Sequence, residues 1–330
     1  MNNLETIQYL AQAEAKHFAP LRNDMHTNLM EDGVPHLLVQ KVNQTYEVQM
    51  QGHHGHDNEG RAPLICSFVK MNVLAHLDPA IDASGVYPIE LHDSYSYLAP
   101  DSPAHRAKYR GALTFSKPIG HGHTILFPDP YQITGYGGML GVTDPLEFDK
   151  KQDIVLFAGT TTGDRAPLRN ERIKACLWAM DKRPRYQFYI TNIAQMTIND
   201  MRNGISDPDL QSILHSPIQH ADHFQCKYIF NIKGNTCCWS RVPMIMNSNS
   251  LMLNLRHSDA TWYYPLLQDN HHFVSVPTIE SLPSIVQQCA STPLRSKQIV
   301  ANANQFVKNF CGQVHASYYA KCLFEAMALN

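Results

Sequence analysis

A segment rich in glycine and hydroxyl residues, FAGTTTGDRAPLR at residues 157–169, has the composition of an anion site. An apolar strand ends at Gly159, Thr160–Thr162 follow, and Arg165 stands before a helix-like stretch. Glycine lets backbone N–H groups approach a ligand, hydroxyls donate hydrogen bonds, and a helix N-terminus adds partial positive charge. Arg165 would clamp phosphate oxygens through two parallel donors. A tight strand-to-helix turn explains the segment about as well.

A second segment of the same kind is KYIFNIKGNTCCWSRVPMIMNSNSLMLN at residues 227–254. Its strand ends at Gly234, and Arg241 lies near the start of the next helix. Arg241 is equally well explained by a surface ion pair. Two strand–glycine–arginine units in one half of a chain could, however, neutralise a diphosphate together without a metal ion.

The segment PIELHDSY at residues 88–95 offers a candidate base. Its strand ends at His92 and Asp93, and the carboxyl ends of strands in α/β sheets face the crevice where ligands bind. An aspartate is ionised at neutral pH and can accept a proton. A helix or turn cap is the commoner role for an aspartate in this pattern.

Other constellations do not support a metal centre. The clusters HHGHD (53–57) and HGH (121–123) match neither a helix-borne HExxH motif nor a cysteine–histidine zinc site. Asp207 and Asp209 formally spell the DxD of metal-dependent sugar transferases, but Pro208 between them predicts a helix-starting turn. The adjacent Cys237–Cys238 pair is interpreted as packing.

Alternating strands and helices must position these residues. Apolar strands predicted at 154–159, 186–191, 227–234, 250–255 and 271–276 alternate with helices such as 171–180 and 281–289, which indicates a parallel sheet covered on both faces. The first half is mixed, with a helix predicted at 68–77 and a strand at 86–91. Two amphipathic helices are predicted to end the chain, and the halves to divide near residue 145.

Bulk composition is that of an ordinary globular protein. The chain has 330 residues, enough for two domains, with 44% hydrophobic and 17% charged residues. A net charge of −2 argues against a nucleic-acid partner. The N-terminal residues have helical apolar spacing with no signal-peptide pattern, no stretch reaches membrane-span length, and the eight cysteines form no CxxC pair. We therefore expect free thiols and a cytoplasmic protein.

The segments occur in an order that resembles glycosyltransferase family 90 over roughly residues 60–310. KYIFNIKGNTCCWSR, the following SLMLN, WYY and HHFVSVP are similar to the family's strand, glycine loop, Ser-Arg, "nSlvl", "WYY" and "hyvpv" segments. FAGTTTGDR resembles its FRG-(S/A)-T-T-x-x-R segment. IELHDSYSY and GALTFSKP resemble its N-x-R-D-x-P strand end and F-S-F-S-K segment.

The resemblance implies an α/β fold of the GT-B kind, with two Rossmann-like domains facing across a cleft and a C-terminal helix crossing back to the first. We expect an acceptor-side domain at 1–145, a nucleotide-sugar-binding domain at 146–300, and C-terminal helices at 301–330 that pack on the first domain.

The resemblance also implies an inverting hexosyl- or pentosyltransferase that uses a nucleotide-sugar donor, commonly a UDP-sugar, and requires no metal or other cofactor. Asp93 falls on the family's catalytic base. The predicted donor-binding residues are Gly159, Thr160, Thr161, Thr162, Arg165, Gly234, Asn235, Ser240 and Arg241. The predicted acceptor-side residues are His92, Ser116 and Lys117.

Two departures from the family pattern affect the acceptor and phosphate surroundings. His92 replaces the family's arginine before the catalytic aspartate, and Ala158 replaces the arginine of its FRG segment. The absent signal peptide favours the bacterial branch, and hence a lipopolysaccharide or other surface-glycan acceptor at the inner face of the membrane, with at most peripheral membrane contact. The alternatives are a protein O-glycosyltransferase and a nucleotide-binding protein that has lost catalysis.

Overall fold

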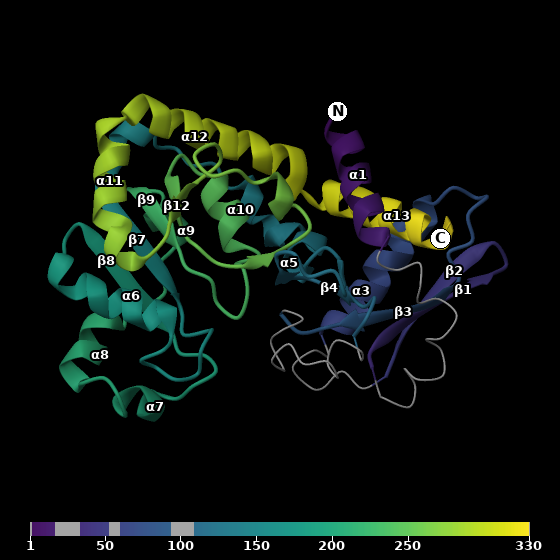
Figure 1. The fold of residues 1–330 in the computed structure, drawn as a ribbon, viewed down its shortest axis with the longest axis horizontal. Coiled ribbons are helices and arrows are strands. Elements are labelled where there is room, and N and C mark those ends of the chain that lie inside the picture. The colour runs from purple at the N-terminus through teal and green to yellow at the C-terminus, as the bar shows by residue number, and fades with distance from the viewer. Residues whose placement is uncertain (1, 17–33, 53–59, 94–108, 330) are drawn as a thin grey trace. The chain divides into compact units, whose positions relative to one another are not determined.

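The structure, a computed structural model, describes residues 2–16, 34–52, 60–93 and 109–329, which form two compact units (Figure 1). The first unit comprises Met1–Gly137, Ser258–Pro265 and Asn309–Asn330. The second comprises Gly138–His257 and Leu266–Lys308. The chain therefore leaves the second unit twice to complete the first.

The second unit is built on a five-stranded sheet in which every strand pair is parallel. Its strands, in the order in which they lie, are β12 (Val274–Val276), β10 (Leu251–Leu255), β9 (Cys226–Asn231), β7 (Gln152–Thr160) and β8 (Tyr186–Asn192). Counted along the chain from β8, the order is 2-1-3-4-5. This doubly wound order reverses direction between β7 and β9, which is where such sheets bind ligands. The predicted parallel sheet is confirmed.

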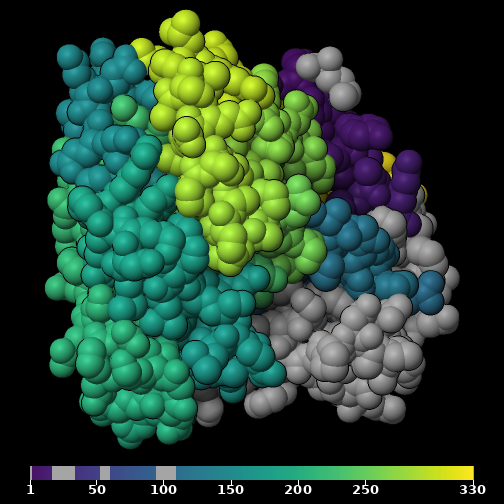
Figure 2. All heavy atoms as spheres, turned by 60° about the vertical axis from the view of Figure 1, so that its left-hand side comes forward, coloured from purple at the N-terminus to yellow at the C-terminus, as the bar shows by residue number. Residues whose placement is uncertain are grey.

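Helices and aromatic rings cover this sheet. Phe188 stacks on Phe230 with ring centres 5.4 Å apart and meets Phe157 edge to face at 6.0 Å. Figure 2 shows α11 and α12 as a yellow-green ridge over the second unit. The helices of this unit are α6 (Glu171–Ala179), α7 (Ile198–Arg202), α8 (Asp207–Ile213), α9 (His220–His223), α10 (Arg241–Met246), α11 (Leu282–Ser291) and α12 (Pro293–Phe306).

The first unit contains a mixed sheet. Its strands, in spatial order, are β2 (Thr45–Gln51), β1 (His36–Val42), β3 (Gly85–Glu90), β4 (Leu113–Thr114) and β6 (Ile125–Leu126). β3, β4 and β6 are parallel, whereas β1 pairs antiparallel with both β2 and β3. The β1–β2 hairpin was not predicted from the sequence, and its turn residues Asn43 and Gln44 have positive φ of 49° and 66°. β5 (Lys117–Pro118) and β11 (Asp259–Ala260) form a separate ribbon.

The last helix returns to the first unit. α13 (Gln313–Leu329) packs against α1 (Asn3–Ala15), and Tyr319 of α13 donates to the Leu126 carbonyl at 3.0 Å. The Trp262 ring stacks on Tyr319 with centres 4.4 Å apart. α3 (Arg61–Phe68) continues into the short turns η3 (Val69–Val73) and η4 (Leu74–His76), and α5 (Pro130–Ile133) is the remaining helix among the described residues of this unit.

Short 3-10 or π turns link the longer elements, at η5 (Gly135–Gly141), η6 (Phe148–Lys150), η7 (Met180–Lys182), η8 (Tyr264–Leu266), η9 (Ile279–Ser281) and η10 (Val307–Cys311). All eight cysteines are free thiols, as predicted. Ser206 caps α8 and Asp207–Asp209 form its first turn, which confirms the helix-starting interpretation of that segment. Within the described ranges no helix is long and apolar enough to cross a membrane.

A buried carboxyl group caps α5 in the first unit. Asp129 is 1% exposed, and its Oδ1 accepts from the amides of Tyr131 at 2.9 Å and Gln132 at 3.1 Å. Its Oδ2 is buried without a hydrogen-bond partner among the described residues. Burial raises the pKa of Asp129 to about 7, against the lowering effect of those amides and of the Arg61 charge. The folded protein therefore holds a proton there that the unfolded chain releases near pH 4.

We expect Asp129→Asn to become more stable relative to the wild type as pH rises from 4 to 7. Between pH 4 and pH 7 the free energy of unfolding of the wild type falls, because folding takes up a proton at Asp129. The full shift in the pKa of Asp129 corresponds to about 4 kcal/mol. The introduced asparagine keeps the capping oxygen and does not titrate. Urea unfolding of both proteins at several pH values measures the difference, and a difference that stays constant with pH would contradict the expectation.

Candidate functional site

The carboxyl ends of β7 and β9 bring the two predicted strand–glycine–arginine segments together. These strands are neighbours, with Val155 opposite Tyr228 and Leu156 opposite Ile229. Because they run parallel, the loops that follow them leave the same edge of the sheet, at the point where the strand order reverses. The sequence identified both loops, and the sheet order explains why they meet.

Arg172, on the first turn of α6, joins the two loops. Its Nη1 donates to the Thr160 carbonyl at 3.1 Å and to the Thr162 hydroxyl at 2.6 Å. Its Nε donates to the Lys233 carbonyl at 2.9 Å, and its Nη2 to the Ile232 carbonyl at 3.0 Å. Arg172 is 5% exposed, and no carboxylate pairs with it in the described part of the chain. Neutral groups, most of them oxygens, therefore satisfy this buried charge.

Two glycines leave the space that the arginines occupy. A Cβ on Gly159 would lie 2.7 Å from Nη2 of Arg241 and 3.1 Å from the Phe157 ring. A Cβ on Gly234 would lie 2.6 Å from the Thr162 hydroxyl and 3.1 Å from Nη2 of Arg172. Both distances to the nearest atom are shorter than a relaxed van der Waals contact. Close side-chain packing is therefore the reason for glycine at each position.

Arg241 enters the same corner at the start of α10. Its Nη2 donates to the Ala158 carbonyl at 2.5 Å, and its guanidinium lies 5.0 Å from the centre of the Phe157 ring. Its Nη1 is buried and has no hydrogen-bond partner within the described ranges. Burial, together with the nearby charge of Arg172, lowers the pKa of Arg241 to about 10. A cation held where its charge is disfavoured gains stability when an anion binds beside it.

The loop after β7 is held by side chains that the sequence analysis did not single out. Asn170 caps α6 and donates from Nδ2 to the carbonyls of Thr161 and Asp164, each at 2.9 Å. The amide of Gly163 donates to Oδ1 of Asn235 at 3.0 Å, which ties the predicted donor residue Asn235 to the first loop. An asparagine directly before a helix was the available sequence signal.

Not every predicted donor residue points into this corner. The buried Thr161 hydroxyl bonds to the backbone of Ala194, donating to its carbonyl at 2.7 Å and accepting from its amide at 2.8 Å. Arg165 lies exposed on the loop. Ser240 occupies the N-cap position of α10 without a side-chain capping bond.

The structure corrects the interpretation of the cysteine pair. Cys237 is 2% exposed, in agreement with packing. Cys238, by contrast, is half-buried, and its Sγ accepts from Nη2 of Arg172 at 3.2 Å and donates to the Ile232 carbonyl at 3.3 Å. The thiol is therefore part of the polar corner, because the basic group beside it comes from a helix distant in sequence.

Asp93, the predicted base, lies in the first unit just beyond the end of β3. Nη2 of Arg61, at the start of α3, donates to its Oδ1 at 2.8 Å, and Nη1 of Arg61 donates to the Leu91 carbonyl at 2.5 Å. The side chains of Arg61 and Asp93 are 27% and 30% exposed. The carboxylate is thus oriented yet reachable from solvent. Arg61 carried no recognisable signal in the sequence.

The predicted acceptor-side residues already have partners in the fold. His92 pairs through Nδ1 with Glu90, which is 2% exposed. The Lys117 ammonium donates to Glu14 of α1 at 2.7 Å and to the Thr124 carbonyl at 2.8 Å. Ser116 is fully buried, and its carbonyl accepts from Thr114. A role for these three residues toward an acceptor stays a prediction.

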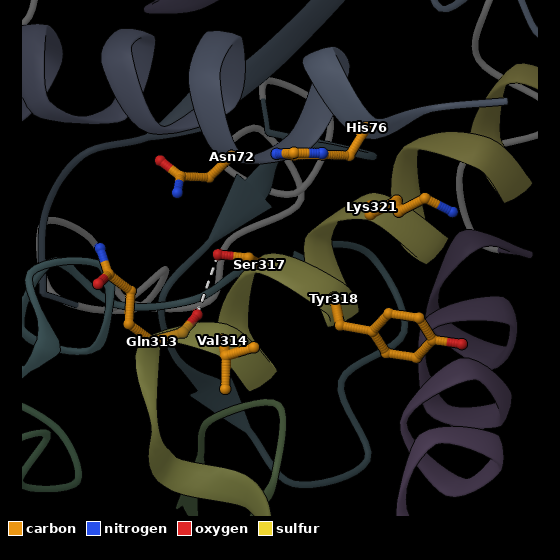
Figure 3. A pocket seen from close by; sticks show the side chains of 7 residues that line it. All are labelled: Asn72, His76, Gln313, Val314, Ser317, Tyr318 and Lys321. Atoms are coloured by element: carbon orange, nitrogen blue, oxygen red, sulfur yellow. Dashed lines mark hydrogen bonds between the residues drawn. The ribbon is translucent and has the colours of Figure 1, made fainter. Parts of the chain in front are cut away.

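A hollow of about 420 Å³ in the first unit lies apart from all these residues. Asn72 and His76 line one side, and residues of α13 line the other (Figure 3). Nε2 of Gln313 donates to the Ile133 carbonyl at 2.6 Å, and Ser317 donates to the Gln313 carbonyl at 3.0 Å. Because these groups are already bonded, we assign the hollow no function. No group of three or more metal-ligating side chains occurs in the described ranges.

The sequence profile described as Glycosyl transferase family 90 matches residues 160–328, just over half of the chain. The chain belongs to glycosyl transferase family 90. Membership confirms the predicted enzyme class, a glycosyltransferase. Two α/β units and a last helix that returns to the first unit form the GT-B architecture expected of it. A comparison with curated protein sequences found no match.

Solved structures of other glycosyltransferases show a distant likeness. TarM is 9% identical, with a TM-score of 0.39 over 59% of this chain and 37% of its own. HepE from Anabaena, solved with UDP and glucose, is 11% identical. Its TM-score is 0.35, and the match covers 58% of this chain and 51% of HepE. Sucrose-phosphate synthase from Thermosynechococcus elongatus is 12% identical. Its TM-score is 0.39, and the match covers 64% of this chain and 57% of the synthase. The family 90 chain thus spans between about a third and three fifths of their lengths.

We expect Arg172→Lys to lower the free energy of unfolding by at least about 2 kcal/mol. A lysine ammonium cannot reach both loops, so buried carbonyls would lose their donors. Urea unfolding of the full chain measures the loss. Lys174→Met, an exposed position on the same helix, is the control and should change stability by less than about 0.5 kcal/mol. Equal stabilities of the two variants would show that Arg172 does not hold the loops together.

Proposed function

We propose that this chain is an inverting glycosyltransferase that moves a sugar from a UDP-sugar to a hydroxyl group of a lipopolysaccharide or another surface glycan. In this proposal the second unit binds the nucleotide-sugar and the first unit provides the acceptor side, with Asp93 as general base. The observation that carries the donor assignment is the pair of arginines without carboxylate partners, Arg172 and Arg241, at the reversal point of a parallel sheet.

The corner between the loops after β7 and β9 suits a diphosphate. Arg241 has one buried nitrogen without a partner, and Arg172 adds a second positive charge beside it. Guanidinium groups bind phosphate oxygens through parallel N–H donors. Gly159 and Gly234 keep the surrounding backbone free of side chains that would displace the arginines. We infer that these charges stabilise the leaving diphosphate in place of a metal ion.

In the proposed reaction Asp93 acts on the acceptor hydroxyl. One carboxylate oxygen is held by Arg61. The other would accept the proton of the acceptor hydroxyl while the acceptor oxygen attacks the anomeric carbon. The bond from that carbon to the diphosphate oxygen breaks on the opposite face, and its electron pair leaves with UDP. Attack and departure on opposite faces invert the configuration of the anomeric carbon.

UDP should bind the purified full chain in excess EDTA with a dissociation constant in the micromolar range. Arg241→Ala should weaken binding by about tenfold to a hundredfold, the usual cost of losing a charged hydrogen bond. Isothermal titration calorimetry measures both.

Two further variants sharpen the UDP experiment. Arg185→Ala removes an equal charge from an exposed ion pair with Asp153 and should bind UDP like the wild type. Gly159→Ala should weaken UDP binding because its Cβ displaces the Arg241 guanidinium. Binding that requires added Mg²⁺ or Mn²⁺ would overturn the metal-free donor site.

Asp93→Asn should reduce sugar transfer by about a hundredfold to ten-thousandfold, the usual contribution of a general base, and leave UDP affinity unchanged. UDP release from a panel of UDP-sugars, with a lipopolysaccharide extract as acceptor, measures the rate. Arg61→Gln should lower kcat with little effect on the KM of the donor, and Arg61→Lys should recover part of the loss. Because Arg61 acts through Asp93, the double variant should be no slower than Asp93→Asn alone. Full activity of Asp93→Asn would disprove the mechanism.

A further inference from the structure

The first unit contains a cavity of about 750 Å³ that none of the predicted site residues lines. One wall is the tip of the β1–β2 hairpin, and the other is the helical run η3–η4 with the following segment. The hairpin turn lies at the right-hand edge of the molecule in Figure 1. Arg61, which holds Asp93, begins α3, and the continuous run α3–η3–η4 ends at His76, so Arg61 and His76 stand at opposite ends of it. The cavity is therefore separate from the candidate base.

The register of the hairpin explains why a cavity forms there. Leu37 and Val39 are buried on the inner face of β1, but Lys41, next on the same face, is exposed and pairs across the hairpin with Tyr46. The Tyr46 hydroxyl donates to the Ile81 carbonyl at 3.0 Å and thereby fixes the segment after η4. The tip of the hairpin thus extends beyond the part of the sheet whose inner face is buried.

The floor of the cavity is apolar and its rim is positively charged. Leu74 is 3% exposed at the floor, whereas Met71 is 60% exposed. Lys41 and Lys70 line the rim, and neither makes an ion pair among the residues that the structure describes. Lys41 lies 5.5 Å from the centre of the Tyr46 ring. Two unpaired ammonium groups beside exposed apolar side chains fit a ligand with an anionic and an apolar part.

The remaining charges around the cavity do not cancel this pattern. Asp78 lies in the lining, and its Oδ1 accepts from the Ala80 amide at 2.9 Å. Glu47 is one residue from Tyr46 and so points to the other face of the hairpin. Among the described residues that line the cavity, the two lysines therefore outnumber the one acidic residue, Asp78.

We propose that this cavity binds the head group of an anionic phospholipid at a membrane surface, with Lys41 and Lys70 on the phosphate. Met71, together with Val42 at the hairpin tip, which is 40% exposed, would enter the boundary between head groups and acyl chains. A soluble phosphate ion would use the lysines but not the apolar floor. The contact is peripheral, is made by the first unit alone, and does not depend on the donor site.

The test is flotation of the full chain with vesicles of phosphatidylcholine containing about one-third phosphatidylglycerol, compared with pure phosphatidylcholine. The wild type should float with the anionic vesicles and stay behind with the neutral ones. Lys41→Gln combined with Lys70→Gln should weaken binding by at least about tenfold, and Met71→Ser should weaken it further.

A matched control removes two exposed lysines of the second unit, Lys150→Gln with Lys308→Gln, for the same change in net charge. This control should bind anionic vesicles like the wild type, and thermal unfolding should show that every variant is folded. Equal loss in both double variants would indicate attraction by net charge and overturn the proposed site. Absence of wild-type binding to anionic vesicles would also overturn it, whatever the outcome of the UDP titration.

Discussion

The hydrogen bonds of Arg172 are the interaction on which the candidate donor site depends. The loops after β7 and β9 carry the glycines, hydroxyls and second arginine of that site, but the sheet fixes only where each loop begins. One guanidinium spans both loops and donates to oxygens of Thr160, Thr162, Ile232 and Lys233. Its planar fork has donors in several directions, which a lysine lacks. Arg172 thus makes most of the hydrogen bonds that join the two loops, and the Gly163–Asn235 bond adds another.

The chemistry of the corner follows from the lack of carboxylate partners for Arg172 and Arg241 among the described residues. A buried arginine in a stable protein is usually paired with a carboxylate, because an isolated buried charge is costly. Here carbonyls, hydroxyls and a thiol take the carboxylate's place around Arg172, and burial together with the charge of Arg172 lowers the pKa of Arg241. In the proposed donor site the guanidinium groups are held before the ligand arrives, so an anion would meet Arg241 already in position.

In the first unit, too, one arginine joins two elements, but there its guanidinium binds a carboxylate, that of the candidate base. Arg61 binds both the Leu91 carbonyl and the Asp93 carboxylate, so the end of β3 and the start of α3 orient the base together. His92 stands directly before this aspartate in the sequence. The guanidinium of Arg61 reaches Asp93 from another element, while His92 bonds to Glu90.

The sequence by itself determined the elements whose pattern is local. Apolar runs ending in glycine predicted β7 and β9, the alternation of strands with helix-like segments predicted α6 and α11, helical spacing predicted the tail helices, and Pro208 predicted the start of α8. It also determined the two loops and the family, since these depend on the order of short motifs along the chain. The β1–β2 hairpin escaped prediction because its turn, Asn43–Gln44, lacks the glycine that usually marks such turns.

Only the tertiary structure decided which side chains meet. Arg172 is an unremarkable arginine in a helix, and Arg61 lies more than thirty residues from the aspartate that it binds. The same holds for Cys238, whose neighbour comes from α6, and for Lys117, which binds Glu14 of α1. Backbone conformation depends on neighbours a few residues away, whereas the partners of a long charged side chain depend on the order of strands in the sheet. That order is set by the packing of the whole unit, and no short segment of sequence contains it.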